Sequence, residues 1–390
     1  MKKVSVFAFA FVVAVVHGGK TFSCQLDGKS RTDGFSCKFG SGENDVSFCE
    51  RHPCVRADWE AFAEKHSAAS VKKANAEDAV LGRSAGTRTK LVRLTDMPVV
   101  CSEVHSVDGC APSFLPDGKE FSLTWHDEFN GGGLDETKWS YRTNFWGRRA
   151  HWFASPEDGC VEVKGGRLHL KLKKLPNGQF VSPQLQTGGL IWDLPRVQNP
   201  SGFWPLAKRE KPKFVHRYGY YECRCRLQRK PGWWSAFWLN SIDIGATLDP
   251  ARSGVEIDVM ESFVPGEVIP HCFHYNGYGP DYKVFVTPRM KRGEKPKTSP
   301  HILKLGSEEF HTYGLLWESD GFTIFVDGKQ HGEKVGKGKG EVVSQTKEFI
   351  YITTEAMNYK KNGTKDPRLD EALGDDFAVD YIRVFDIVED

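Results

Sequence analysis

The chain has 390 residues, of which 39% are hydrophobic and 27% charged, so it can build a packed core and is not a wholly disordered protein. Lys and Arg number 53 against 51 Asp and Glu, and the formal net charge of +2 excludes a strongly basic protein that binds nucleic acid through its charge. At roughly 100–200 residues per domain, this length predicts two domains, or one large β domain with an appendage.

The chain opens with the pattern of a secretory signal peptide. Lys2 and Lys3 precede an uncharged, mostly apolar run from Val4 to Val16, and Gly18 is a small residue suited to a cleavage point. The run is too short to span a bilayer, although an N-terminal anchor or a buried helix is the alternative. We therefore predict a signal peptide over residues 1–18, a secreted extracellular protein and no other membrane association.

Residues 19–118 form a Cys-rich N-terminal region. Four cysteines crowd into its first part: Cys24, Cys37, Cys49 and Cys54. In a secreted chain they are disulfide candidates of undetermined pairing. A zinc site is the alternative, which the lack of a C-x2-C pair among these four disfavours.

A helix is expected within this region, from Asp58 to about Gly82. Asp58 is placed to cap it, and Trp59 and Phe62 lie three residues apart, as on one helix face. The role of residues 19–118 is unknown: a carbohydrate-binding module, a pro-region and an attachment module are all compatible with the composition.

From Phe121 onward, short runs of alternating apolar and polar residues are separated by Gly, Pro, Asn and Asp. Examples are residues 167–172, 220–226 and 379–384. Alternation with a period of two predicts strands, and many short strands predict a β-sandwich or a barrel.

The densest chemical signal is a group of three acids, Glu256, Asp258 and Glu261, between Gly254 and Phe263. On a strand, Glu256 and Asp258 share one face, whereas strict alternation would turn Glu261 to the other face. A β-bulge at Val259-Met260 would insert one residue and return Glu261 to the acidic face. We expect that bulge.

Clustered carboxylates raise one another's pKa, so one group can be protonated while another is ionised. A retaining glycosidase needs that division, and it holds its two carboxyl groups roughly 5–5.5 Å apart. The alternatives are a solvated acidic strand face and a calcium site built from oxygen ligands.

The pattern Glu256-x-Asp258-x-x-Glu261 resembles the bulged signature of glycoside hydrolase family 16, in the form carried by its laminarinase, agarase and carrageenase branches. Other segments resemble the family in the family's order: residues 125–131, 218–224, 235–239, 310–317 and 377–384. The resemblance covers about residues 119–388, so we assign residues 119–390 to the catalytic domain. It implies an all-β, concanavalin-like β-jelly-roll sandwich with a cleft across its concave sheet.

By this resemblance, Glu256 is the nucleophile and Glu261 the acid/base, with Asp258 between them. The implied protein is a monomeric endo-β-glycanase that acts on a polysaccharide, either β-1,3-glucan or an algal galactan, and requires no cofactor. A transglycosylase is the alternative enzyme. A non-catalytic glycan-binding protein on the same fold is the alternative from another class, but lectin-like relatives usually lose the catalytic acids, which are all present here.

The resemblance also suggests residues that contact the substrate, although core packing is the alternative for each tryptophan. They are Trp146, Trp233, Trp234, Trp238, His274 and Glu355. Since Trp233 and Trp234 are adjacent, they would face opposite sides of a strand, so we expect only one of them to touch the sugar.

Two further expectations concern structural support. Many relatives hold a calcium ion between the opening and closing strands, where Glu128 and Asp380 lie in this chain, although alternation on a strand also explains Asp380. Cys223 and Cys225 are expected to pair with Cys272 or Cys160 and so brace the sheet.

Overall fold

The structure is a computed structural model that describes most of the chain from residue 103 onward. The described ranges are 103–142, 152–178, 180–188, 190–192, 208–209, 211–241, 244, 250–269, 272–275, 283–286, 302–305, 308–336, 343–356 and 367–388, together with strands at 22–26, 35–39, 45–47 and 91–92. The signal peptide, the helix expected near Asp58 and the loop with Trp146 lie outside these ranges. In the described part, no helix is long and apolar enough to cross a membrane.

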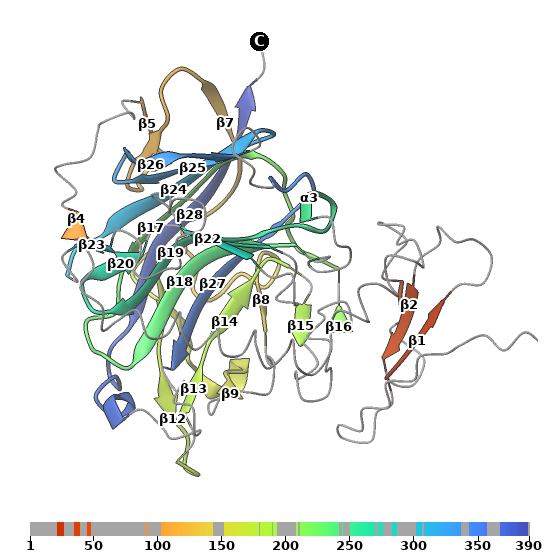
Figure 1. Cartoon of the computed structure of the whole chain (residues 1–390). Helices are drawn as coiled ribbons and strands as arrows, with labels where there is room; N and C mark the ends of the chain where they lie inside the picture. Colours follow the sequence, from red (N-terminus) through yellow and green to blue (C-terminus); the bar gives the residue numbers. More distant parts are fainter. Residues whose placement is uncertain are drawn as a thin grey trace, which may run out of the picture.

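Two large β-sheets make up most of the described chain (Figure 1). The back sheet has the order β10-β11-β28-β17-β24-β25-β26, and β7 also pairs with β28. Its strands are β7 (Glu120–Asp127), β10 (Val161–Val163), β11 (Leu168–Leu170), β17 (Gly219–Arg226), β24 (His311–Glu318), β25 (Gly321–Val326), β26 (Lys329–Gly336) and β28 (Phe377–Val388).

The front sheet has the order β4-β23-β20-β19-β18-β27-β14-β8, and β21 pairs with both β19 and β22. Its strands are β4 (Leu91–Val92), β8 (Ser140–Tyr141), β14 (Gln184–Gln186), β18 (Trp233–Asn240), β19 (Glu256–Val264), β20 (Glu267–Ile269), β21 (Cys272–Tyr275), β22 (Lys283–Val286), β23 (Ile302–Lys304) and β27 (Phe349–Ala356).

Smaller elements complete the described chain. They are the N-terminal sheet of β1 (Phe22–Leu26), β2 (Phe35–Phe39) and β3 (Asp45–Ser47), the pair of β5 (Glu103–His105) and β6 (Ser113–Leu115), the sheet of β9 (Trp152–Phe153), β12 (Lys173–Lys174) and β13 (Phe180–Ser182), the pair of β15 (Leu190–Trp192) and β16 (Lys208–Arg209), and the helical turns η3 (Pro156–Asp158), α3 (Pro250–Ser253) and η7 (Pro367–Leu369).

The core lies between the two large sheets, because alternate residues of each strand point inward. Tyr221 of β17 and Val384 of β28 belong to the same buried cluster as Phe237 of β18 and Ile257 of β19. All four side chains are fully buried. Burial of one face of each sheet against the other is the physical basis of a sandwich. The expected all-β jelly-roll sandwich is confirmed.

The segment just before β7 packs on the outer side of the back sheet. Phe114 and Leu115 of β6 pack with Tyr220, Leu316 and other buried residues of that sheet. Glu222, fully buried in the same layer, accepts hydrogen bonds from the Phe114 backbone N–H at 3.0 Å and the Tyr381 hydroxyl at 2.5 Å. Residues 113–115 therefore cover the back sheet, although they precede the boundary at residue 119 expected from sequence.

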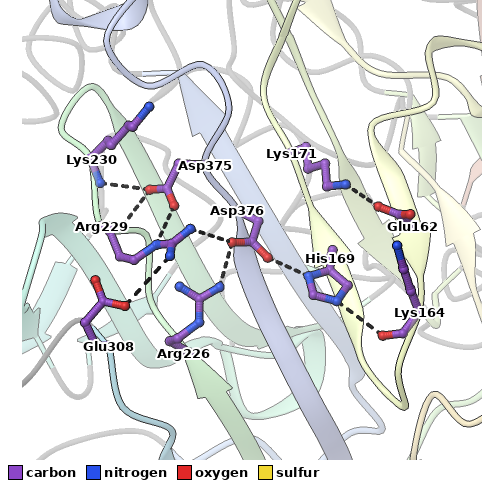
Figure 2. Close-up of polar contacts among 10 residues, drawn as sticks. All are labelled: Glu162, Lys164, His169, Lys171, Arg226, Arg229, Lys230, Glu308, Asp375 and Asp376. Carbon is purple, nitrogen blue, oxygen red and sulfur yellow. Dashed lines mark hydrogen bonds and ion pairs between the residues drawn. The ribbon is translucent and has the colours of Figure 1, made fainter.

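A network of charged groups fixes the loop between β17 and β18 to the start of β28 (Figure 2). The Asp375 carboxylate accepts hydrogen bonds from the backbone N–H groups of Arg229 at 2.6 Å and Lys230 at 2.8 Å, and from Nε of Arg229 at 2.9 Å. Asp376 pairs with Arg226 at 2.6 Å and His169 at 2.5 Å. The network thereby anchors the loop that leads into β18.

The disulfides expected in the sandwich are not formed by the cysteines that the structure describes. Cys160, Cys223 and Cys225 are free thiols in the buried interior, and Cys110 is a free, partly exposed thiol. Cys223 and Cys225 project from one face of β17 into the core among hydrophobic side chains, and both are free thiols, so the expected pairing with Cys272 or Cys160 is wrong. In the N-terminal sheet, Cys24 lies opposite Cys37 in the β1–β2 register.

Candidate active site

The three acids of β19 owe their common face to a β-bulge. In the pairing of β18 with β19, Trp238 lies opposite Asp258 and Phe237 lies opposite Met260, so Val259 is the extra residue. Val259 and Met260 are both buried in the core. The bulge therefore resets the alternation, and the expectation of a bulge at Val259-Met260 is confirmed.

Two neighbouring strands supply polar partners to these acids. His274 of β21 lies opposite Glu256, and its Nε2 is 2.8 Å from Oδ2 of Asp258 and 3.6 Å from Oε1 of Glu256. On the other side, Asn240 of β18 donates a hydrogen bond from Nδ2 to Oε2 of Glu256 at 3.2 Å. Glu256, Asp258, Glu261 and His274 are each 4–9% exposed, so all four reach the surface only narrowly.

Burial and mutual repulsion raise the pKa values of the two glutamates. Burial raises the pKa of Glu261 to about 8, with a further contribution from the charge of Asp258, while His274 and a hydrogen bond from the Trp234 side chain act in the opposite direction. Burial and Asp258 also raise the pKa of Glu256, against the lowering influence of His274 and Arg142. At Glu256 the hydrogen bond from Asn240 opposes this rise, because it favours the ionised form that a nucleophile needs.

Trp238 lies on the acidic face, opposite Asp258. Its ring stacks on Tyr351 of β27 with the centroids 4.0 Å apart and an interplanar angle of 23°. Its indole Nε1 donates to Oγ1 of Thr353 at 3.0 Å, and the Arg142 guanidinium lies 5.1 Å from the Tyr351 ring centroid. Trp238 thus provides an aromatic ring beside the acids, and its contact with substrate stays a prediction.

The structure separates the two adjacent tryptophans. Trp233 is fully buried and packs with Leu172 and Phe180 in a separate hydrophobic cluster, so its expected contact with substrate is wrong: its side of β18 faces the core. Trp234 is half-buried, stacks on Phe263 with centroids 4.8 Å apart, and lies opposite Glu355 of β27. The expectation that the pair faces opposite sides is confirmed.

Glu355, in contrast, remains a candidate contact, since it lies on the acidic face in register with Trp234 and retains 6% exposure. Asn240, Tyr351 and Arg142 are residues of this site that the sequence analysis did not identify. Alternation from Trp234 and Trp238 along β18 could have indicated Asn240. Arg142 and Tyr351 come from distant segments, and no local pattern marks them.

The expected calcium site between the opening and closing strands does not fit the structure. Both carboxylate oxygens of Glu128 accept hydrogen bonds from Arg383, each at 2.8 Å. Asp380 pairs with Arg224, and its other oxygen lies 3.6 Å from Nε of Arg167. Arginine cations thus occupy the oxygen atoms that calcium would need. In the described residues, the group able to hold a metal is instead Glu256, Asp258 and His274.

Comparison with known proteins identifies the family of the chain. A family model described as beta-porphyranase A-D, GH16 domain, matches residues 122–387. Glucan endo-1,3-beta-glucosidase A1 of Niallia circulans is 26% identical over 290 residues, which are 68% of this chain and 38% of that protein. Beta-porphyranase C of Zobellia galactanivorans is 28% identical over 259 residues, which are 57% of this chain and 68% of that protein.

Kappa-carrageenase of Pseudoalteromonas carrageenovora is 29% identical over 258 residues, which are 61% of this chain and 58% of that protein. The chain therefore spans less than two thirds of the glucanase and of the carrageenase. The family model, however, covers more than half of this chain and includes the whole of the bulged strand β19. The chain belongs to glycoside hydrolase family 16.

Proposed function

We propose that the protein is a secreted, retaining endo-β-glycanase with Glu256 as nucleophile and Glu261 as acid/base. The bulge of β19 is the observation that carries this proposal, because it places both glutamates on one face with Asp258 between them. The pKa of about 8 for Glu261 supports its role, since a general acid must hold a proton near neutral pH.

The reaction follows from these positions in two steps. The ionised Glu256 attacks the anomeric carbon, and Glu261 gives its proton to the leaving glycosidic oxygen, which leaves a covalent glycosyl-enzyme. Glu261 then removes a proton from water, and the resulting attack on the anomeric carbon releases Glu256. Two displacements retain the β configuration. His274 lies within 3.6 Å of Glu256 and 2.8 Å of Asp258, so it connects the two carboxylates and helps to position Glu256.

The relatives' names support a substrate class: they include a glucan endo-1,3-β-glucosidase, a porphyranase and a carrageenase. We propose a β-linked polysaccharide of the β-1,3-glucan or algal galactan class. Trp238 and Trp234 offer aromatic faces beside the acids, suited to stack on sugar rings. Secretion is supported by the signal-peptide pattern of residues 1–18.

The test is reducing-end release from laminarin, mixed-linkage glucan, agarose, porphyran, κ-carrageenan and xyloglucan by wild type and Glu256→Gln. We expect cleavage of one glycan into oligosaccharides, with the activity lost in the variant. Products longer than the starting chains would support the transglycosylase instead. Folded protein that cleaves none of the glycans but binds one would replace the hydrolase with a glycan-binding protein.

A further inference from the structure

The acidic face combines two carboxylates with an imidazole in a geometry close to that of a metal site. Glu256, Asp258 and His274 each offer one ligand atom, and these atoms all lie within 4.8 Å of one another. The three side chains come from two paired strands, with His274 directly opposite Glu256. From this arrangement we propose that they bind one divalent transition-metal cation of the zinc class, which blocks the active site.

Two of the three distances between ligand atoms fit such an ion after a small adjustment. Zinc bonds of about 2.0–2.2 Å in a tetrahedron place the ligand atoms roughly 3.3–3.6 Å apart. His274 Nε2 already lies 3.6 Å from Oε1 of Glu256 and 2.8 Å from Oδ2 of Asp258. The contact between His274 and Asp258 needs to lengthen by only about half an ångström, and the fourth position of the tetrahedron is left for water.

A second observation beside the cluster also points to a cation. Asn240 is fully buried and uses Nδ2 on Glu256, while its Oδ1 has no hydrogen-bond partner within the described structure. A buried acceptor without a partner is costly. A hydrated cation held by Glu256 supplies the water protons that this oxygen lacks.

The ligand set also predicts which metals bind. One imidazole nitrogen with two carboxylate oxygens suits zinc and its neighbours, whereas calcium requires six to eight oxygen ligands. Each of the three ligand residues retains 4–9% exposure, which gives an ion narrow access from solvent. An ion bound there occupies Oε1 of Glu256, so it competes with glycan. That inhibition rests on the proposed function, whereas binding of the ion does not.

The experiment is a competition between the full-length protein and a chromophoric zinc indicator, with zinc chloride as the only added metal. Wild type, His274→Gln and the control His311→Gln are compared. His311 is a matched control because it is similarly buried and pairs with Asp327 at 2.7 Å, but lies on the back sheet away from the acids. Zinc bound by cysteine thiols is common to all three proteins and cancels in the comparison.

We expect His274→Gln to lose one zinc equivalent or to bind it about tenfold or more weakly, while the control binds as wild type does. Calcium chloride should not displace zinc from this site. Equal zinc binding by all three proteins overturns the proposal. Should His274→Gln fail to fold by circular dichroism, Asp258→Asn replaces it with the same expectation.

Activity gives the second readout. On the glycan that the panel identifies, zinc should inhibit wild type competitively, and a chelator should restore the rate. Non-competitive inhibition, or none at saturating zinc, overturns the blocking role. Tight zinc binding that depends on His274, in a protein that cleaves no glycan, would leave the metal site standing and refute the proposed hydrolase.

Discussion

Glu261 differs from an ordinary glutamate only through its surroundings. It lies on a strand whose other face is in the hydrophobic core, and it is next to the charge of Asp258. Burial is the larger cause of its raised pKa. The same residue on an exposed strand would be ionised at neutral pH and unable to donate a proton.

This pKa predicts the alkaline limb of the activity profile. The acid is active while protonated, so kcat/KM should fall as the pH rises through about 8. Glu261→Gln should reduce polysaccharide hydrolysis by about 10²–10⁴-fold. It should affect an aryl glycoside with a good leaving group much less, and the alkaline limb should vanish. An unchanged limb in the variant would assign it to another group.

The adjacent tryptophans should respond to mutation in opposite ways. Trp233→Ala removes a fully buried ring from a packed cluster and should cost about 3–5 kcal/mol of unfolding free energy. Trp234→Ala removes a half-buried ring stacked on Phe263, so it should raise KM for the polysaccharide with a smaller loss of stability. Urea unfolding and steady-state kinetics on both variants measure the contrast, and a reversed pattern would contradict the assignment of faces.

At the level of elements, the start of β18 depends on contacts that lie outside the front sheet. The loop before it is fixed to the start of β28 through Asp375 (Figure 2). Within the same loop, Gln228 donates a hydrogen bond to the carbonyl oxygen of Ser262 at 3.0 Å, one residue after Glu261. The loop thus connects the back sheet to the strand that carries the acids.

Asp375→Asn tests how much this connection contributes. Asp375 accepts three hydrogen bonds, and its side chain is 1% exposed, so loss of its charge should cost about 1–3 kcal/mol of unfolding free energy. The matched control is Asp370→Asn, since Asp370 pairs with Lys174 at the surface with both side chains at least 40% exposed. The control should change stability by less than about 0.5 kcal/mol. Equal losses of unfolding free energy in the two variants would show that the loop contact contributes no more than the surface ion pair.

At the scale of the whole molecule, the sandwich buries acidic side chains in surroundings that disfavour their ionised form. Glu348 is fully buried beside the start of β19, where one oxygen accepts the Val255 backbone N–H at 3.0 Å. Burial raises its pKa to about 8, and burial raises the pKa of Glu222 to about 7. Both groups are therefore protonated in the folded protein at pH values where the unfolded chain is ionised.

Glu348 therefore predicts how stability depends on pH. The Glu348 carboxyl holds a proton in the folded protein that it releases in the unfolded chain. Its contribution to the unfolding free energy is therefore complete below the ordinary pKa of 4.5 and is lost as the pH rises to about 8. The Glu348→Gln variant lacks this titration. Its unfolding free energy should fall less between pH 5 and pH 8 than that of wild type. Parallel pH curves for the two proteins would contradict the assignment.

The sequence by itself determined the strands and the acidic cluster. Both are local: a period of two marks which residues share a strand face, and the spacing of Glu256, Asp258 and Glu261 requires a bulge between them. The same alternation placed Trp233 and Trp234 on opposite faces. It did not say which face meets the core, because both orientations obey the same period.

Only the tertiary structure decided that question, and it also decided which residues surround the acids. His274 and Asn240 reach Glu256 from paired strands, and Arg142 comes from a separate segment of the chain. The pairing of β28 with β7 also brings Arg383 onto the Glu128 carboxylate, where calcium was expected. Such contacts join residues far apart in sequence, and they are fixed by the packing of two sheets, which no local period encodes.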